Sequence, residues 1–196
     1  LRRRQPGRSP SVISLSPLLG DVILTKIESG DVMPRSTDDM IGEQSIGRIG
    51  LFFGASWCAP AVSMMHKLVD WYVEVRTSGN AVEIIYISDD EGQSAFDEVY
   101  MEMPWTAIPF SEKSTRRALT QRFEISGIPE LIFIDSNGRI IADGSLAADI
   151  VESDPRGDKL MSLSSSAPVD DLLRQGVVMP SQRAERAMPR GGGGGG

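Results

Sequence analysis

The only cysteine of the chain, Cys58, lies in the stretch Trp57-Cys58-Ala59-Pro60-Ala61. The apolar run 49–56 directly before it predicts a short buried strand, and residues 62–71 directly after it predict an amphipathic helix. A thiolate is the attacking species in thiol–disulfide exchange, and a helix N-terminus favours the thiolate electrostatically. The spacing therefore predicts a nucleophilic sulfur presented where a helix begins.

The composition argues against several other kinds of chemistry. A single cysteine excludes an intramolecular disulfide and a zinc site built from several thiolates. His66 is the only histidine, so a metal site would need carboxylate ligands, and the acidic residues show no metal-loop pattern. We predict no metal site and no tightly bound cofactor. No apolar run approaches the ~20 residues that span a bilayer, so we expect a soluble protein. The oligomeric state stays open.

Charge is unevenly distributed along the 196 residues. Residues 21–162 hold 24 Asp and Glu against 12 Lys and Arg, a balance of −12, which would repel nucleic-acid phosphates. We therefore expect no nucleic-acid partner. Residues 1–20 hold four arginines and no acid, which is typical of a mitochondrial targeting segment and equally of a disordered tail. The predicted localisation is cytoplasmic, or mitochondrial if this segment targets the chain there.

Three parts follow from these patterns. Residues 1–20 are predicted to be a disordered or targeting N-terminal tail, and residues 21–162 a single folded domain. Residues 163–196 are rich in Ser, Pro and Gly and end in six glycines, which predicts a disordered C-terminal tail.

The folded part shows an alternation of strands and helices. Further strands are predicted at 21–27 (an edge strand), 82–88, 131–135 and 139–142, and helices at 94–101 and from an N-cap at Ser114 to about 123. Residues 36–44 are predicted to be a loop or a short helical turn. Asn137-Gly138 favours a hairpin with a type I′ turn. The order predicts an α/β fold: a parallel βαβ unit joined to an antiparallel hairpin, with helices on both sheet faces.

Four segments share sequence features with one known family. Gly54-Ala55-Ser56-Trp57-Cys58 resembles an S-A-S-W-C entry, and the segment from Met103 to Phe110 closely resembles an M-P-W-x-x-x-P-[FY] run. Residues 126–132 resemble an S/G-I-P-T-L segment, and residues 151–157 resemble a closing D-P-x-G. In this order and spacing, over about residues 27–160, they resemble the tryparedoxin and nucleoredoxin group of the thioredoxin-like superfamily. The resemblance implies a three-layer α/β/α fold with a mixed central sheet.

The resemblance also implies roles for individual residues. Cys58 would be the nucleophile of a disulfide oxidoreductase. The substrate groove would be shaped by Trp57, Pro60, Trp105, Ile128 and Pro129. Pro129 would follow a cis peptide bond, and Trp105 could equally be a core residue.

Two positions depart from the family pattern. Ala61 stands where the family has its second, resolving cysteine, and Glu130 stands where it has Thr, which adds a negative charge that would disfavour a thiolate. An engineered origin of Ala61 stays open.

Without a resolving cysteine, a weakened or monothiol oxidoreductase is predicted. Cys58 would form mixed disulfides with a disulfide- or thiol-bearing protein. An external low-molecular-weight dithiol or glutathione would then release the product. The alternative is a redox-inactive thioredoxin-like module that binds a partner protein or peptide.

Overall fold

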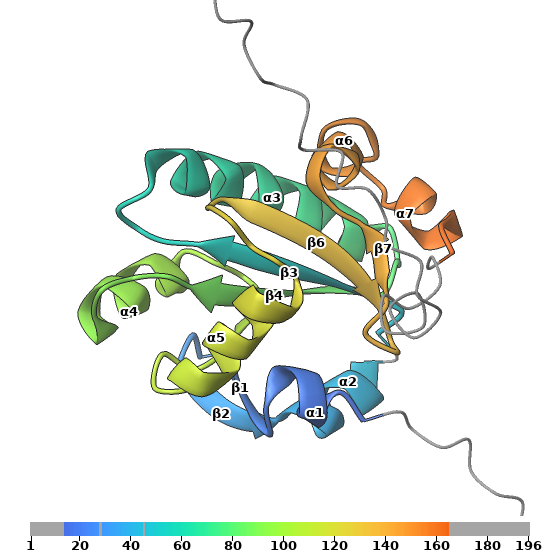
Figure 1. The fold of residues 1–196 in the computed structure, drawn as a ribbon. Coiled ribbons are helices and arrows are strands. Elements are labelled where there is room, and N and C mark those ends of the chain that lie inside the picture. The colour runs from blue at the N-terminus through green and yellow to red at the C-terminus, as the bar shows by residue number, and fades with distance from the viewer. Residues whose placement is uncertain (1–13, 28, 45, 165–196) are drawn as a thin grey trace, which may run out of the picture. The chain divides into compact units, whose positions relative to one another are not determined.

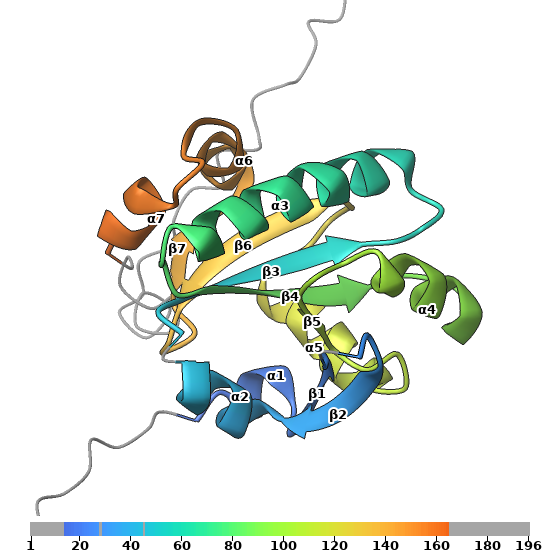
Figure 2. The same ribbon diagram turned by 180° about the vertical axis from the view of Figure 1, so that it is seen from behind.

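The computed structural model describes residues 14–164 except 28 and 45; the segments 1–13 and 165–196, which contain most of both predicted tails, lie outside the described residues. The helices are α1 (Ser16–Leu19), α2 (Thr37–Gln44), α3 (Ala59–Thr77), α4 (Gln93–Met101), α5 (Lys113–Arg122), α6 (Gly144–Ser153) and α7 (Asp158–Ser162) (Figures 1 and 2). The strands are β1 (Val22–Lys26), β2 (Val32–Ser36), β3 (Arg48–Gly54), β4 (Val82–Ser88), β5 (Thr106–Ala107), β6 (Glu130–Asp135) and β7 (Ile140–Ala142).

All seven of these strands form one mixed sheet in the order β2-β1-β5-β4-β3-β6-β7. β3 and β4 are parallel and are joined through α3, which forms the predicted βαβ unit. β6 runs antiparallel to β3 and continues through a hairpin into β7. β3 thus lies between a parallel and an antiparallel neighbour, and its C-terminal end leads into α3.

Two apolar layers cover the two faces of the sheet, because successive side chains of a strand point to opposite faces. Ile49, Leu51 and Phe53 of β3 belong to the layer that includes α1, α2 and α5. Phe52, between them, belongs to the layer that includes α3, α4 and α6. Figure 1 shows α3 and α6 on one side of the sheet and α1, α2 and α5 on the other. The predicted three-layer α/β/α architecture is confirmed.

Several local predictions differ from the structure. β1 is not an edge strand, because β2 pairs along its outer side and carries Pro34 at the sheet edge, where a missing N–H is tolerated. Residues 36–44, predicted to be a loop or a short helical turn, contain the eight-residue helix α2. The N-cap of α5 is Glu112, and Ser114 lies inside the first turn.

The hairpin between β6 and β7 also differs from its prediction. A type I′ turn needs a positive φ at both central residues, but only Gly138 has one, at 73°. The Asp135 carboxylate accepts the N–H groups of Asn137 (2.8 Å) and Arg139 (3.0 Å). These bonds hold Asn137 outside the left-handed region, so the positive φ falls on the glycine alone.

The ordered domain begins earlier than predicted. α1 lies within the predicted N-terminal tail, and Leu15 and Leu19 are both buried in the layer shared with α2 and α5. Pro17 in the first turn of α1 pre-sets the helical φ, and the two leucines, four residues apart, face the same side. The tail prediction is therefore wrong for residues 15–20.

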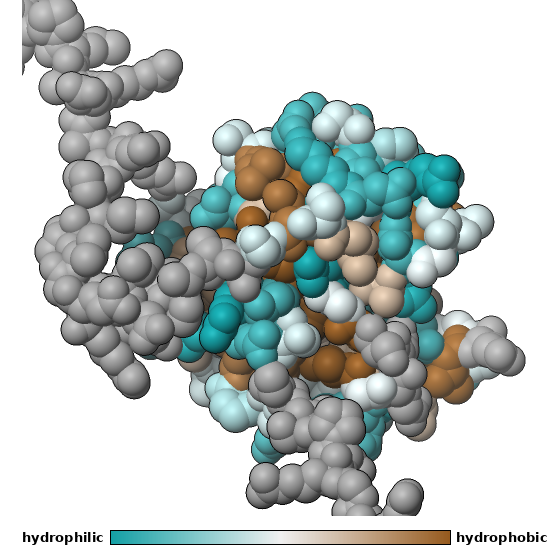
Figure 3. Space-filling model, turned by 90° about the vertical axis from the view of Figure 1, so that its right-hand side faces the viewer, coloured by the Kyte–Doolittle hydropathy of each residue, from teal (hydrophilic) through white to brown (hydrophobic). Residues whose placement is uncertain are grey.

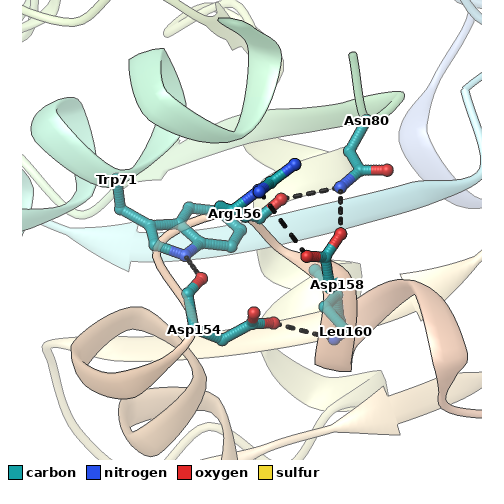
Figure 4. A network of polar contacts seen from close by, with 6 residues as sticks. All are labelled: Trp71, Asn80, Asp154, Arg156, Asp158 and Leu160. Atoms are coloured by element: carbon teal, nitrogen blue, oxygen red, sulfur yellow. Dashed lines mark hydrogen bonds and ion pairs between the residues drawn. The ribbon is translucent and has the colours of Figure 1, made fainter. Parts of the chain in front are cut away.

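The segment that follows α6 is fastened to α3 by polar contacts (Figure 4). The Trp71 indole N–H donates to the Asp154 carbonyl (2.8 Å), and the Asp154 carboxylate accepts the Leu160 N–H (3.0 Å). Gly157 has a φ of 74°, and a Cβ there would lie 3.0 Å from Val75, so only glycine fits this turn. These contacts lock α7 against the end of α3.

One acidic side chain is buried within the sheet. Glu83 of β4 is 2% exposed, and it accepts hydrogen bonds from the Tyr72 hydroxyl (3.1 Å) and the Thr106 N–H (3.2 Å). Burial raises the pKa of this carboxyl to about 7, against the lowering effect of its donors and of the Arg76 charge.

None of the described helices has the length and apolarity that a membrane crossing requires. In the same part of the chain, no group of three or more His, Cys, Asp or Glu side chains is arranged to hold a metal ion.

Replacing Leu19, which is 0% exposed, tests whether α1 belongs to the folded domain. Leu19→Ala should lower the free energy of unfolding by about 2–5 kcal/mol in urea titrations, because it leaves a cavity between α1 and the sheet. Leu146→Ala, at a 39% exposed leucine of α6, is the matched control and should cost less than about 1 kcal/mol. Equal losses in the two variants would contradict the assignment of α1 to the core.

Glu83 predicts a pH dependence of stability. Its folded pKa of about 7 exceeds the ordinary value of 4.5, so its contribution is fully present below pH 4.5 and is lost as the pH rises through 7. Between pH 5.5 and 8, the wild-type chain should lose roughly 2 kcal/mol of unfolding free energy relative to Glu83→Gln, measured in urea at each pH. If the difference in unfolding free energy between the wild-type chain and Glu83→Gln were the same at pH 5.5 and at pH 8, the raised pKa of Glu83 would be refuted.

Candidate active site

Cys58 lies at the N-cap of α3, immediately after the C-terminal end of β3. Its N–H donates to the Ala55 carbonyl (3.1 Å), and its own carbonyl accepts the N–H groups of Ala61 (2.8 Å) and Val62 (3.1 Å). Pro60 occupies the first turn, where its missing N–H breaks no hydrogen bond. The backbone therefore places the half-buried sulfur at the positive end of a 19-residue helix, as the sequence predicts.

The segment before β6 lies against this sulfur. The Cys58 thiol donates to the Ile128 carbonyl at 3.7 Å, which joins residues 70 positions apart. The Ile128–Pro129 peptide bond is cis, the isomer that the family resemblance implies. Within the described part of the chain, the Ile128 N–H has no hydrogen-bond partner. Ile128 therefore offers an unused donor beside the thiol.

A buried carboxylate holds the loop that carries Cys58. Asp90 accepts hydrogen bonds from the Ser56 N–H (2.7 Å), the Tyr86 hydroxyl (2.9 Å) and the Ser88 hydroxyl (2.7 Å). Beside it, the Trp57 indole N–H donates to the Asp89 carbonyl (3.2 Å). The loop after β4 thus fixes the loop after β3. The sequence analysis gave Asp89 and Asp90 no role. They follow a parallel strand, however, and functional groups in α/β sheets gather at the C-terminal ends of such strands.

Ala61 faces the protein interior. Its methyl group is buried in an apolar cluster lined by Phe52, Ala55, Val62, Met65, Tyr86, Val99 and Met103. A Cβ added to the neighbouring Gly54 would lie 3.4 Å from the Ala61 Cβ, so the surroundings are closely packed. The position three residues after Cys58 is therefore filled by a chemically inert group.

Four of the predicted groove residues lie in three different places. Trp57, 59% exposed, and Ile128 lie at one cavity with Cys58. Pro60 is exposed but lines a separate depression of about 240 Å³ between α3 and α6. Trp105 is 2% exposed and packs edge-on against Tyr72 and Phe52, so of its two predicted positions it takes the one in the core. Burial of this large aromatic surface in the core outweighs exposure at a rim.

The cavity at Cys58 has a volume of about 680 Å³ and contains side chains that the sequence analysis missed. Lys113, Arg116 and Arg117 of α5 line it. Their spacing of i, i+3 and i+4 places them on one helix face, which was the available signal. Glu130 is half-buried as the first residue of β6, where it pairs with Phe53.

Asp90→Ala should loosen the loop that presents the sulfur. It removes the acceptor shared by Ser56, Tyr86 and Ser88, and we expect the free energy of unfolding to fall by about 2–4 kcal/mol in denaturant titrations. Asp89→Ala, at the exposed neighbour, is the matched control and should change it by about 0.5 kcal/mol or less. If both substitutions had the same small effect, the Asp90 contacts would not support the site.

The chain is similar to characterised thioredoxin-fold proteins. A family model described as thioredoxin-like matches residues 48–140. Nucleoredoxin of Danio rerio is 38% identical over 93 residues, which is 47% of this chain and 22% of that protein. The chain spans between about a fifth and a quarter of the length of the curated nucleoredoxins of Danio rerio, Bos taurus and Arabidopsis thaliana that it matches.

The match to tryparedoxins covers most of their length. Tryparedoxin of Trypanosoma brucei brucei is 38% identical over 122 residues, which is 59% of this chain and 83% of that protein. A solved tryparedoxin from Trypanosoma brucei superposes with a TM-score of 0.62 at 31% identity, covering 74% of this chain and 94% of that one. A structure of tryparedoxin II complexed with glutathionylspermidine has a TM-score of 0.56 at 26% identity, covering 63% of this chain and 85% of that one. This chain belongs to the tryparedoxin and nucleoredoxin group of thioredoxin-like proteins.

Proposed function

We propose that this chain is a monothiol thiol–disulfide oxidoreductase that forms mixed disulfides through Cys58. One observation carries the proposal: the sulfur is presented at a helix N-terminus and opens into a cavity, while the buried methyl group of Ala61 occupies the resolving position. The first feature suits attack on a disulfide, and the second removes the intramolecular route to its release.

The exchange proceeds in two thiolate attacks. The Cys58 thiolate attacks one sulfur of a substrate disulfide, the substrate S–S bond breaks, and the other substrate sulfur leaves as a thiolate. An external thiolate then attacks the mixed disulfide and restores Cys58 as a thiolate. The external thiol is oxidised in the same step, because its sulfur keeps the new S–S bond. Each attack breaks one S–S bond and forms another, so the external thiol supplies the reducing equivalents.

The residues around the sulfur support a peptide-like substrate. The unpaired Ile128 N–H can bond the backbone of an extended chain that approaches Cys58. The exposed Trp57 ring, held by its indole N–H, offers an apolar contact at the rim. A disulfide-bearing protein is therefore the proposed partner. A tryparedoxin II structure that is similar to this chain is complexed with glutathionylspermidine, which supports a small thiol as the external thiol.

The stoichiometry of reaction with dithiobis(nitrobenzoate) tests the monothiol proposal. The folded wild-type chain should release one equivalent of thionitrobenzoate and keep the other as a stable mixed disulfide, seen in the intact mass. Ala61→Cys should release a second equivalent rapidly, because the introduced thiol displaces the first adduct. Cys58→Ser should release none.

The outcomes separate the two candidate functions. A wild-type chain that reacts only after unfolding would not present its thiol, and the domain would then be a redox-inactive module that binds a protein or peptide. Release of only one equivalent by folded Ala61→Cys would show that position 61 does not act as a resolving position.

A further inference from the structure

The cavity beside Cys58 has the size of a small-molecule site. Its volume of about 680 Å³ lies within the range of about 300–1,000 Å³ that ligand pockets occupy. Its walls come from the ends of β3 and β4, from α5 and from the segment that precedes Pro129. A ligand in this cavity would therefore lie beside the sulfur.

On the face drawn in Figure 3, at the opposite end of the sheet, hydrophobic residues are interspersed with hydrophilic ones.

The cavity gathers positive charge in an acidic domain. Lys113, Arg116 and Arg117 line it, and Asp89 is the acidic residue among its lining side chains. Residues 21–162 contain 12 basic residues against 24 acidic ones, so a quarter of these cations lie at one cavity. A cleft lined by one sign of charge concentrates ions of the opposite sign, and here it favours anions.

The three cations differ in how many contacts they already make within the protein. Arg116 is fixed: its guanidinium donates to the carbonyls of Ser88 (2.6 Å) and Phe110 (2.8 Å) and lies 4.5 Å from the centre of the Phe110 ring. Its buried Nε has no hydrogen-bond partner within the described residues. Asp89 and Asp90 offset part of its charge.

Lys113 and Arg117 are the cations available to a ligand. Both side chains are exposed, and neither forms an ion pair with any residue that the structure describes. They lie four residues apart on α5 and so can reach the same bound molecule. Arginine and lysine are the side chains that bind carboxylates, and arginine can do so through two parallel hydrogen bonds.

We propose that this cavity binds the carboxylates of an anionic low-molecular-weight thiol, of the glutathione type, while its sulfur is joined to Cys58. The inference rests on the proposed function and specifies the small-molecule half of the Cys58 mixed disulfide. In the first step, the Cys58 thiolate attacks a glutathionyl mixed disulfide, Cys58 takes over the glutathionyl sulfur, and the former partner leaves as a thiolate. A second glutathione thiolate then attacks the bound glutathionyl sulfur and gives glutathione disulfide and the Cys58 thiolate.

This assignment predicts that the cavity discriminates between small thiols by their charge. A polyamine conjugate such as glutathionylspermidine carries a cationic polyamine in place of the glycine carboxylate of glutathione, so Lys113 and Arg117 would bind it more weakly than glutathione. A carboxylate-bearing thiol gains both the long-range attraction and the short-range hydrogen bonds. The class of thiol that forms the mixed disulfide with Cys58 is therefore set by α5 rather than by the cysteine loop.

Rates of Cys58 mixed-disulfide formation, followed by intact mass, test the inference with three disulfides. Glutathione disulfide is the anionic probe, cystamine the cationic probe, and hydroxyethyl disulfide the uncharged reference for thiol reactivity. In Lys113→Glu/Arg117→Glu, the rate with glutathione disulfide, divided by the reference rate, should fall about tenfold or more, and that with cystamine should rise. The control is Arg139→Glu/Lys159→Glu, which makes the same change in net charge at positions outside the cavity lining and should leave both ratios unchanged.

Each outcome has a separate meaning. Equal ratios in the cavity variant and its control would overturn the inference and leave the monothiol function standing. Failure of the folded wild-type chain to react with hydroxyethyl disulfide would instead overturn the proposed function. An unchanged reference rate in the cavity variant shows that its Cys58 loop is intact, so a fall confined to glutathione disulfide supports the inference.

Discussion

The burial of β3 on both edges and both faces is the constraint on which the site depends. β3 pairs along its length with β4 and β6, and its side chains enter both apolar layers of the domain. A strand held in this way cannot shift its register without exposing one layer. The C-terminal end of β3 is therefore fixed in space together with the first turn of α3. This fixes the position of Cys58.

Three separate parts of the chain meet at this end of β3. The loop after β4 supplies the Asp90 carboxylate that holds Ser56, and the segment before β6 supplies the Ile128 carbonyl that contacts the thiol. α5 adds the cations of the cavity. Segments distant in sequence thus converge on one sulfur, and the buried methyl group of Ala61 lies three residues after it.

The elements nearest the site could be predicted from sequence because local signals specify them. β4 has the predicted bounds 82–88, and β3 and β6 differ from theirs by only a few residues at either end, since buried strands show as uninterrupted apolar runs. α1 and β2 were missed, because Leu15, Leu19 and the outer side of β1 are buried only by tertiary contacts. The sequence left Trp105 open between groove and core, because a motif gives order along the chain and not depth. The cations of α5 were missed because their shared cavity is formed by segments distant in sequence.

The proposed function requires that the fold present Cys58 as a nucleophile. The most direct test compares the second-order rate of iodoacetamide alkylation at pH 7 in the folded chain with that of the same chain unfolded in urea. Cys58→Ser provides the blank. We expect the folded chain to react faster, because the half-buried sulfur lies at the positive end of α3 and opens into the cavity. A thiol that reacts more slowly in the folded chain than in the unfolded chain would show that the fold does not present Cys58 as a nucleophile.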